Sequence, residues 1–327
     1  MYDSWKDASL FAGLEVDLTT NEASVATWRV FDPDFQFLDK WTTNDGIAVL
    51  PARAWLGFGA TLALGEPVFK GLLARVERGV ATSTFRFYDT GFKMRQFKQT
   101  EYHRGLDDVG VIAKLAKQNG LEFEGPSPAL KLDKHKSLMQ DEQTDWEHAL
   151  ERAEEAGLVL YVRGDTLFAK EPAKTGQPVL TLSYRRDFVM RDEFSLSYKV
   201  PENREGRPAK VETRGRGRGG RRLRGSSTER QRGTRQVEVK RDLSISSKRH
   251  ADRRAQARYE LQREHAFSHT VSILPAFKER RPDVRDTVEL LHLGELFSGR
   301  YLCDRVVHRF GPAQLTTDLD LYRDIKE

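Results

Sequence analysis

Two histidines have the spacing that would place both imidazoles on one face of a helix. His265 and His269 are four residues apart, the separation at which helical side chains can bind one zinc ion together. A metalloprotease motif of this kind needs a glutamate directly after the first histidine, and Ala266 stands there. We therefore expect a solvated or interface pair of histidines and no metal site.

The glycines and arginines at residues 215–220 formally satisfy the G-x-G-x-x-G pattern of dinucleotide-binding sites. Such a site requires a buried strand before the glycines and an apolar helix after them. Neither pattern is present, and the sequence has no P-loop lysine motif and no nucleophile-elbow serine. We expect no nucleotide or other cofactor.

Four neighbouring carboxylates could pair for acid–base catalysis. They lie where a helix is expected to begin, and carboxylates at that position favour the helix macrodipole and cap the first turn. The sequence therefore predicts no catalytic residue, and a protein that is not an enzyme. The four residues are Asp141, Glu142, Asp145 and Glu147.

A cluster of nine arginines is the remaining candidate site. The segment that contains them, residues 214–235, has a net charge of +8, because Glu229 is its only acid; the whole chain has a net charge of +5. Guanidinium groups on a flexible backbone bind phosphates in a salt-dependent manner. Because Gly, Ser and Arg dominate, we expect a flexible insertion over residues 203–236 with no packed structure of its own. A polyanion ligand, a protein partner and a plain insertion all stay open. The nine residues are Arg214, Arg216, Arg218, Arg221, Arg222, Arg224, Arg230, Arg232 and Arg235.

Composition excludes several classes of protein. Of the 327 residues, 38% are hydrophobic, so the chain can build real cores and is not globally disordered. No apolar run reaches the roughly 18–20 residues of a membrane-spanning helix. Asp3 and Asp7 stand where a secretory signal has basic residues, so we expect the protein to stay in the cytoplasm. Cys303 is the only cysteine, which excludes an intrachain disulfide and a multi-cysteine zinc site.

The start of the chain has a pattern typical of β-strands, with short runs of alternating apolar and polar residues separated by turn residues. We expect a first β-barrel region over residues 1–104. Its strands are predicted at 11–18, 25–31, 51–58, 67–76 and 80–88.

An α+β region is expected over residues 105–173. Apolar residues recur at helical spacing from Val109, and Gly120 ends that helix. A second helix begins at a capping box formed by Thr144 and Glu147 and ends at Gly157. Strands are predicted at 121–124, 158–162 and 166–169, the last two as a hairpin.

Strands resume in the last part of the chain, and we expect a second β-barrel region over residues 174–327. A helix rich in Arg, Gln and Ala is predicted at 247–265. The fold class is therefore mainly β with an α+β insertion. The predicted strands are 179–184, 195–200, 237–243, 267–274, 286–293, 300–310 and 315–322.

Three stretches resemble the late-control protein D family of phages. This is the baseplate hub family shared with contractile injection systems and with the N-terminal hub part of VgrG spike proteins. The resemblance covers nearly the whole chain and rests on strand and helix signatures. The stretches are residues 66–71, residues 143–147 followed by 156–160, and residues 297–301 leading to 306–310 and 316–319.

The resemblance implies a structural protein with two related, tail-tube-like β-barrel domains and flanking helices. It implies a homotrimer whose six barrels face the hexameric tail tube while the other side receives the central spike. Expected partners are a tail tube protein, a separate spike protein and other baseplate proteins. Cargo, a tape-measure protein or nucleic acid would occupy the lumen. The protein would assemble in the cytoplasm and end in the baseplate of a phage tail or an injection particle; phage, tailocin and toxin injector stay open.

Two rival functions stay open. A nucleic-acid-binding protein would act through the Arg/Gly-rich segment 214–235. A cell-wall hydrolase of the same machine would be an enzyme. The sequence up to Glu327 contains no oligonucleotide-binding barrel, glycine-repeat needle or lysozyme-like domain, which is why a separate spike is expected.

Overall fold

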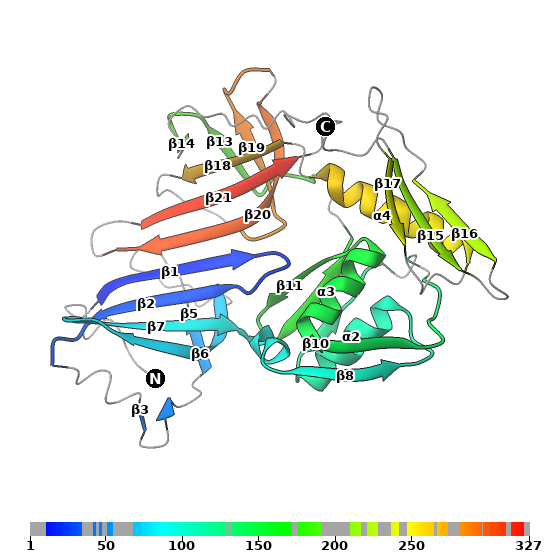
Figure 1. Ribbon diagram of the computed structural model, residues 1–327. Helices are drawn as coiled ribbons and strands as arrows, with labels where there is room; N and C mark the ends of the chain where they lie inside the picture. The colour runs from blue at the N-terminus through cyan, green and yellow to red at the C-terminus, as the bar shows by residue number, and fades with distance from the viewer. Residues whose placement is uncertain are drawn as a thin grey trace.

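The first β region and much of the second belong to one large sheet (Figure 1). The computed structural model describes residues 11–34, 42–43, 46–47, 51–54, 68–127, 130, 132–171, 176–190, 210–216, 221–227, 237–241, 247–264, 267–273, 282–295, 297–311 and 315–323. The strand expected at 195–200 lies outside these residues. No helix among them is long and apolar enough to cross a membrane.

The first β region forms one half of the large sheet. Its strands follow the order β1-β2-β7-β6-β5, and β6 and β7 form a hairpin in which the Gly79 amide donates to the Thr82 carbonyl at 2.7 Å. The expected strands are confirmed where the structure describes them. They are β1 (Phe11–Thr19), β2 (Val25–Phe31), β5 (Pro51–Ala54), β6 (Phe69–Arg78) and β7 (Thr82–Asp89), with a small hairpin of β3 (Thr42–Thr43) and β4 (Gly46–Ile47) beside them.

The second β region closes on itself as a barrel. Its strands pair in the series β13-β19-β20-β21-β18-β14, and a bridge between Tyr184 and Phe188 joins the end of β13 to β14. The bounds expected for this barrel region, residues 174–327, stay a prediction. The strands are β13 (Leu180–Ser183), β14 (Phe188–Met190), β18 (Phe267–Ile273), β19 (Thr287–Leu291), β20 (Gly299–Phe310) and β21 (Leu315–Arg323).

Strands β1 and β20 join the two β regions. They run antiparallel, with Leu14 opposite Phe310 and Thr19 opposite Arg305. An irregularity between Cys303 and Arg305 bends β20, so its first part pairs with β19 and its second part with β1. One apolar core therefore extends across both regions on the inner side of the sheet. Its members include Val16, Phe85 and Phe87 from the first region and Tyr301, Cys303 and Leu319 from the second.

The α+β region has a core of its own, built around Val111, Leu115, Trp146 and Leu160. Two helices cover a three-stranded sheet of order β11-β12-β9, and β8 pairs with β10. The elements are η2 (Thr90–Arg95), β8 (Lys98–His103), α2 (Asp108–Gln118), β9 (Glu122–Glu124), β10 (Leu138–Thr144), α3 (Asp145–Ala156), β11 (Val159–Arg163) and β12 (Thr166–Lys170).

The predicted boundaries of α3 are confirmed in detail. The Thr144 amide donates to Glu147 Oε2 at 2.8 Å and the Glu147 amide donates to Thr144 Oγ1 at 3.2 Å, which completes the capping box. Gly157 ends the helix with φ of 72°, a left-handed conformation that glycine adopts without steric cost.

The Arg/Gly-rich segment is folded wherever the structure describes it, so the expectation of a flexible insertion is wrong for these residues. Strands β15 (Lys210–Arg216), β16 (Arg222–Ser226) and β17 (Val237–Arg241) form a sheet of order β16-β15-β17 beside α4 (Lys248–Glu264). We call β15, β16, β17 and α4 the β3α unit; it lies apart from the second barrel (Figure 1).

The physical reason is the alternation of residues along β15 and β16. Val211 and Gly225 face α4, while Arg214 and Arg224, which are directly paired across the two strands, fall on the opposite face. Ala255 and Tyr259 of α4 complete the small core with Val211. A Cβ added to Gly225 would lie 2.0 Å from the Ala251 carbonyl carbon, so strand and helix touch backbone to backbone.

Candidate interaction surfaces

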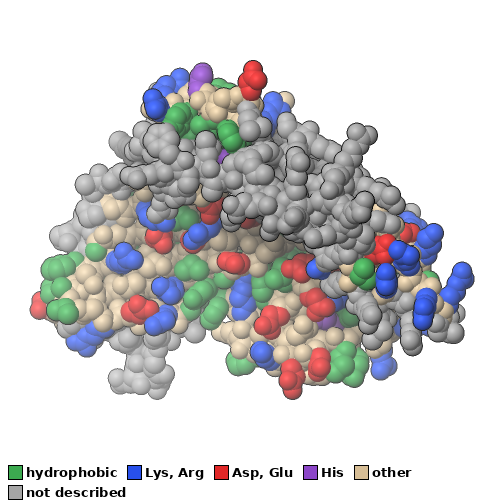
Figure 2. All heavy atoms as spheres, turned by 45° about the horizontal axis from the view of Figure 1, so that its top comes forward, with side chains coloured by type: hydrophobic (Ala, Val, Ile, Leu, Met, Phe, Trp, Pro, Cys, Tyr) green, Lys and Arg blue, Asp and Glu red, His purple; other side chains and the backbone are tan. Residues whose placement is uncertain are grey.

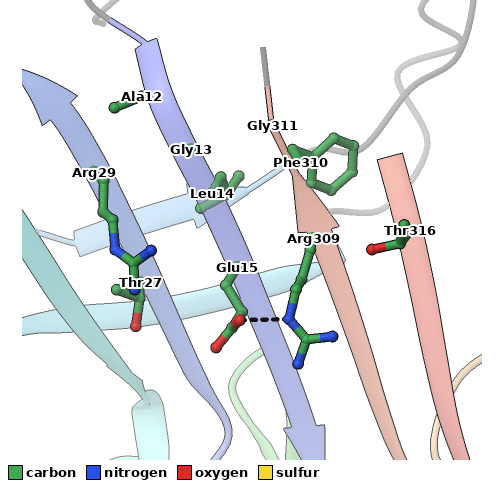
Figure 3. A pocket seen from close by; sticks show the side chains of 10 residues that line it. All are labelled: Ala12, Gly13, Leu14, Glu15, Thr27, Arg29, Arg309, Phe310, Gly311 and Thr316. Atoms are coloured by element: carbon green, nitrogen blue, oxygen red, sulfur yellow. Dashed lines mark hydrogen bonds and ion pairs between the residues drawn. The ribbon is translucent and has the colours of Figure 1, made fainter. Parts of the chain in front are cut away.

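The outer face of the β1–β20 junction carries a ladder of ion pairs. Arg305 donates from Nε and Nη2 to the two carboxylate oxygens of Asp17 at 2.8 and 2.6 Å. Arg309 Nε donates to Glu15 Oε2 at 2.7 Å, and Figure 3 shows these two side chains pointing toward one another across the strands. The hydrogen bonds to Asp17 raise the pKa of Arg305 above its ordinary value.

The ladder continues across the second barrel. Arg309 also pairs with Asp318 of β21, which in turn accepts from the Ser272 hydroxyl of β18. One row further on, Asp320 Oδ1 accepts from the Thr270 hydroxyl at 2.7 Å. The charges on this face are therefore largely matched with one another, strand by strand.

A hollow of about 280 Å³ opens on this face beside Arg309 (Figure 3). Glu15 is the only acid among the described residues that line it, and its carboxylate accepts from Arg309. Among the described residues no group of three or more His, Cys, Asp or Glu side chains is arranged to hold a metal ion. The hollow is lined by Ala12, Gly13, Leu14, Glu15, Thr27, Arg29, Arg309, Phe310, Gly311 and Thr316.

A buried charge cluster joins the β3α unit to the α+β region. Asp108 of α2 accepts from His135 Nε2 at 2.9 Å and lies 3.5 Å from Arg152 Nη1 and 3.6 Å from Arg254 Nη2. Burial alone would raise the pKa of Asp108, but the hydrogen bond from His135 and the neighbouring guanidinium charges hold it below its ordinary value. Arg254 also pairs with Glu155 of α3. No sequence pattern predicted this cluster, because charged residues on amphipathic helices usually face solvent.

Two buried histidines stack on each other within the α+β region. The rings of His103 and His148 lie 5.3 Å apart with an interplanar angle of 18°. Burial, together with the charges of Arg152 and His103, lowers the pKa of His148 to about 4. The imidazole of His148 is therefore neutral at physiological pH, and its Nδ1 lies 3.0 Å from Gln143 Oε1.

The chemical candidates taken from sequence are not brought together. His269 lies buried in β18 with its ring edge-on to Tyr301, so the expectation of a solvated histidine is wrong for His269; His265 lies outside the described residues. Among the acids, Glu147 caps α3, and Asp145 accepts from the side chains of Gln99, Asn119 and Gln140.

The nine candidate arginines divide into two sets. Arg214, Arg221, Arg222 and Arg224 have exposed side chains on or beside β15 and β16, and Arg216 is paired with Arg222 through the backbone register. Figure 2 shows Lys and Arg side chains gathered at the end of the molecule where Figure 1 has β15, β16 and α4. Arg218, Arg230, Arg232 and Arg235 lie outside the described residues.

The fold is similar to that of several solved phage tail and secretion-system proteins. The structure of a tail protein from Neisseria meningitidis MC58 matches with a TM-score of 0.69 at 12% identity, covering 96% of this chain and 93% of that one. The 43 kDa tail protein of prophage MuSo2 from Shewanella oneidensis gives 0.64 at 11% identity, covering 96% and 94%. The E. coli c3393 protein, described as a component of the type VI secretion system with similarity to the T4 tail proteins gp27 and gp5, gives 0.57 at 9% identity, covering 96% and 73%.

The chain belongs to the family described as the Alg8 N-terminal domain, whose model matches residues 14–193. No curated protein has a matching sequence. The identities with the solved structures are low, so these likenesses establish the fold alone. They confirm the predicted fold class, mainly β with an α+β insertion, while membership of the late-control protein D family itself stays a prediction.

Proposed function

We propose that this protein is a structural baseplate hub of a contractile phage tail or injection system. The observation that carries the proposal is the match to tail proteins over 96% of this chain and over 93% and 94% of two of those proteins. A match of that extent includes both β regions and the α+β region. The protein would act by assembly and not by catalysis.

The hub would be a homotrimer that joins the hexameric tail tube to the central spike. Each protomer brings two β regions fused through β1 and β20, so three protomers bring six, which matches the six subunits of a tube ring. A tail tube protein, a separate spike protein and other baseplate proteins would be the partners. The particle would assemble in the cytoplasm and remain in the baseplate.

The ion-pair ladder suits a wall of the lumen. Arg305 and Arg309 are each matched by carboxylates on neighbouring strands, so the face is polar and hydrated yet carries little unmatched charge. Such a wall would not retain a charged cargo that passes along it. If the protein acted only by binding nucleic acid, the large sheet formed by the two β regions would have no part in its function.

The test is the mass of the purified protein in solution, measured by light scattering at high salt so that any nucleic acid dissociates. We expect three times the chain mass of 37.5 kDa, and ring-shaped particles with a central hole and threefold symmetry in electron micrographs. A monomer or a dimer in every salt condition, with no rings, would contradict the hub.

A further inference from the structure

Positive charge is concentrated in the β3α unit and its connecting residues. Residues 210–264 contain 18 of the chain's 54 lysines and arginines and only 7 acids, whereas residues 105–173 contain 8 cations and 14 acids. Part of this positive charge is neutralised inside the protein, since Arg254 pairs with the buried carboxylates of Asp108 and Glu155. These internal ion pairs do not account for the other cations of the unit.

Five of the basic positions of this unit fall on the sheet face that points away from α4. The backbone register sets Arg214 opposite Arg224 on one side and opposite Arg241 on the other, and sets Arg216 opposite Arg222. Directly paired residues share one face of a sheet, and neighbouring strands lie about 4.8 Å apart. Rows of basic positions therefore cross the three strands.

Among the described side chains on this face, Glu212 is the one carboxylate, and it holds the arginines beside it. Its side chain is 4% exposed, and its Oε2 accepts from Arg224 Nε at 2.9 Å and from Arg214 Nη2 at 3.4 Å. The two arginines stay 64% and 49% exposed. Glu212 offsets one of their two charges and holds both guanidinium groups in place.

Two further arginines have their charge unmatched by described residues. Arg221 and Arg222 are exposed, and neither forms an ion pair with any residue that the structure describes. Like charges so close together are unfavourable in water. A polyanion that binds across them would relieve this repulsion.

The surface favours a nucleic acid over an acidic protein. Protein interfaces have an apolar core with aromatic residues, but the three strands contain no aromatic residue, and among their described side chains Val239 is the one exposed large hydrophobic residue. Phosphate groups need only charged donors, and the planar guanidinium fork matches them. We propose that the outer face of β15, β16 and β17 binds the phosphate backbone of a nucleic acid without reading its sequence.

The test uses the full chain with Arg221→Gln and Arg222→Gln combined. Arg224 is left in place because its removal would leave the buried carboxylate of Glu212 without its main partner. The matched control combines Arg75→Gln and Arg186→Gln, which removes the same charge from arginines that are 63% and 75% exposed elsewhere on the protein. Thermal melting of both variants shows whether they remain folded.

Binding is measured by fluorescence anisotropy with a labelled 30-base-pair DNA duplex of arbitrary sequence over a series of salt concentrations. We expect the wild type to bind with strong salt dependence. The double variant should bind at least tenfold more weakly at low salt, and its log–log salt slope should fall by about 1.8, because each phosphate neutralised contributes about 0.9. The control should match the wild type.

Three outcomes would overturn the proposal: no binding of the duplex by the wild type at low salt, equal losses in variant and control, or displacement of the duplex by polyglutamate at an equal concentration of charge. The last result would assign the face to an acidic protein. None of these outcomes affects the hub, whose mass is measured at high salt where the nucleic acid has dissociated.

Discussion

Arg254 of α4 and Glu155 of α3 form a buried ion pair, with Arg254 Nη1 3.2 Å from Glu155 Oε2. The same guanidinium lies 3.6 Å from Asp108 of α2. Gly157, at the end of α3, packs so closely on α4 that an added Cβ would lie 2.5 Å from Ala257 Cβ. The β3α unit is thus attached to the α+β region by a charge cluster and by close backbone packing.

Replacing Arg254 with methionine should destabilise the protein by about 3–5 kcal/mol, because it removes a buried cation from beside two buried carboxylates, Glu155 and Asp108. The free energy of unfolding in urea measures the loss. Lys248→Met is the matched control, since Lys248 is an exposed cation of the same helix, and it should change stability by less than about 0.5 kcal/mol. Similar losses in the two variants would show that Arg254 acts only as a surface cation.

The sequence predicted α4 and the capping box of α3 but not the cluster between these helices. The capping box is a local signal, because both of its residues lie within four positions of each other. Arg254 and Asp108 are far apart in sequence, and neither differs by type from a surface residue. Only the packing of α4 on α3 makes them buried partners.

The folding of the arginine-rich segment was missed for a related reason. Judged by composition alone, residues 214–235 cannot bury enough apolar surface to fold. The strands obtain that surface from α4, whose Ala255 and Tyr259 pack against Val211. The alternation of arginine with Val211, Thr213 and Gly225 is the signal that would have indicated a one-sided strand.

Gly225→Ala should loosen the β3α unit. The atoms that the new Cβ would meet are backbone atoms of Ala251 and Asp252 at 2.0 to 2.4 Å, so strand and helix must separate, at a cost of about 1–3 kcal/mol. The rate of hydrogen exchange of the α4 amides should increase by the factor that corresponds to this loss of free energy. Gly176→Ala is the control, because its Cβ would meet nothing closer than Thr287 Oγ1 at 3.9 Å. Unchanged exchange in the Gly225 variant would contradict the close packing.

The junction of the two β regions had no local signal, because Asp17 and Arg305 are 288 residues apart. A double-mutant cycle with Asp17→Asn and Arg305→Gln should give a coupling free energy of about 0.5–1 kcal/mol, toward the upper end for a partly exposed pair because the contact is bidentate. Urea unfolding of the four proteins provides the cycle.

A second cycle with Glu77→Gln and Arg75→Gln serves as the control. Arg75 and Glu77 form a more exposed pair within the single strand β6, and their coupling should be smaller. If the cycle across β1 and β20 gave no coupling free energy, the ion pair between these strands would balance their charges without stabilising the junction.

Acid should destabilise the protein through His148. Its pKa is about 4 in the folded protein and about 6.5 in an unfolded chain. Between these two values the unfolded chain binds more protons than the folded protein, so the free energy of unfolding falls as the pH falls from 6.5 to 4. The full effect is on the order of 3 kcal/mol, because each pKa unit corresponds to about 1.4 kcal/mol.

His148→Gln removes the titrating group. The slope of the free energy of unfolding against pH should therefore decrease in this window by up to the value for one proton. Urea unfolding at a series of pH values from 4.5 to 8 measures the slope, and above pH 7.5 the two proteins should have parallel curves. A variant that loses as much stability as the wild type between pH 7 and pH 5 would show that other groups cause the acid sensitivity.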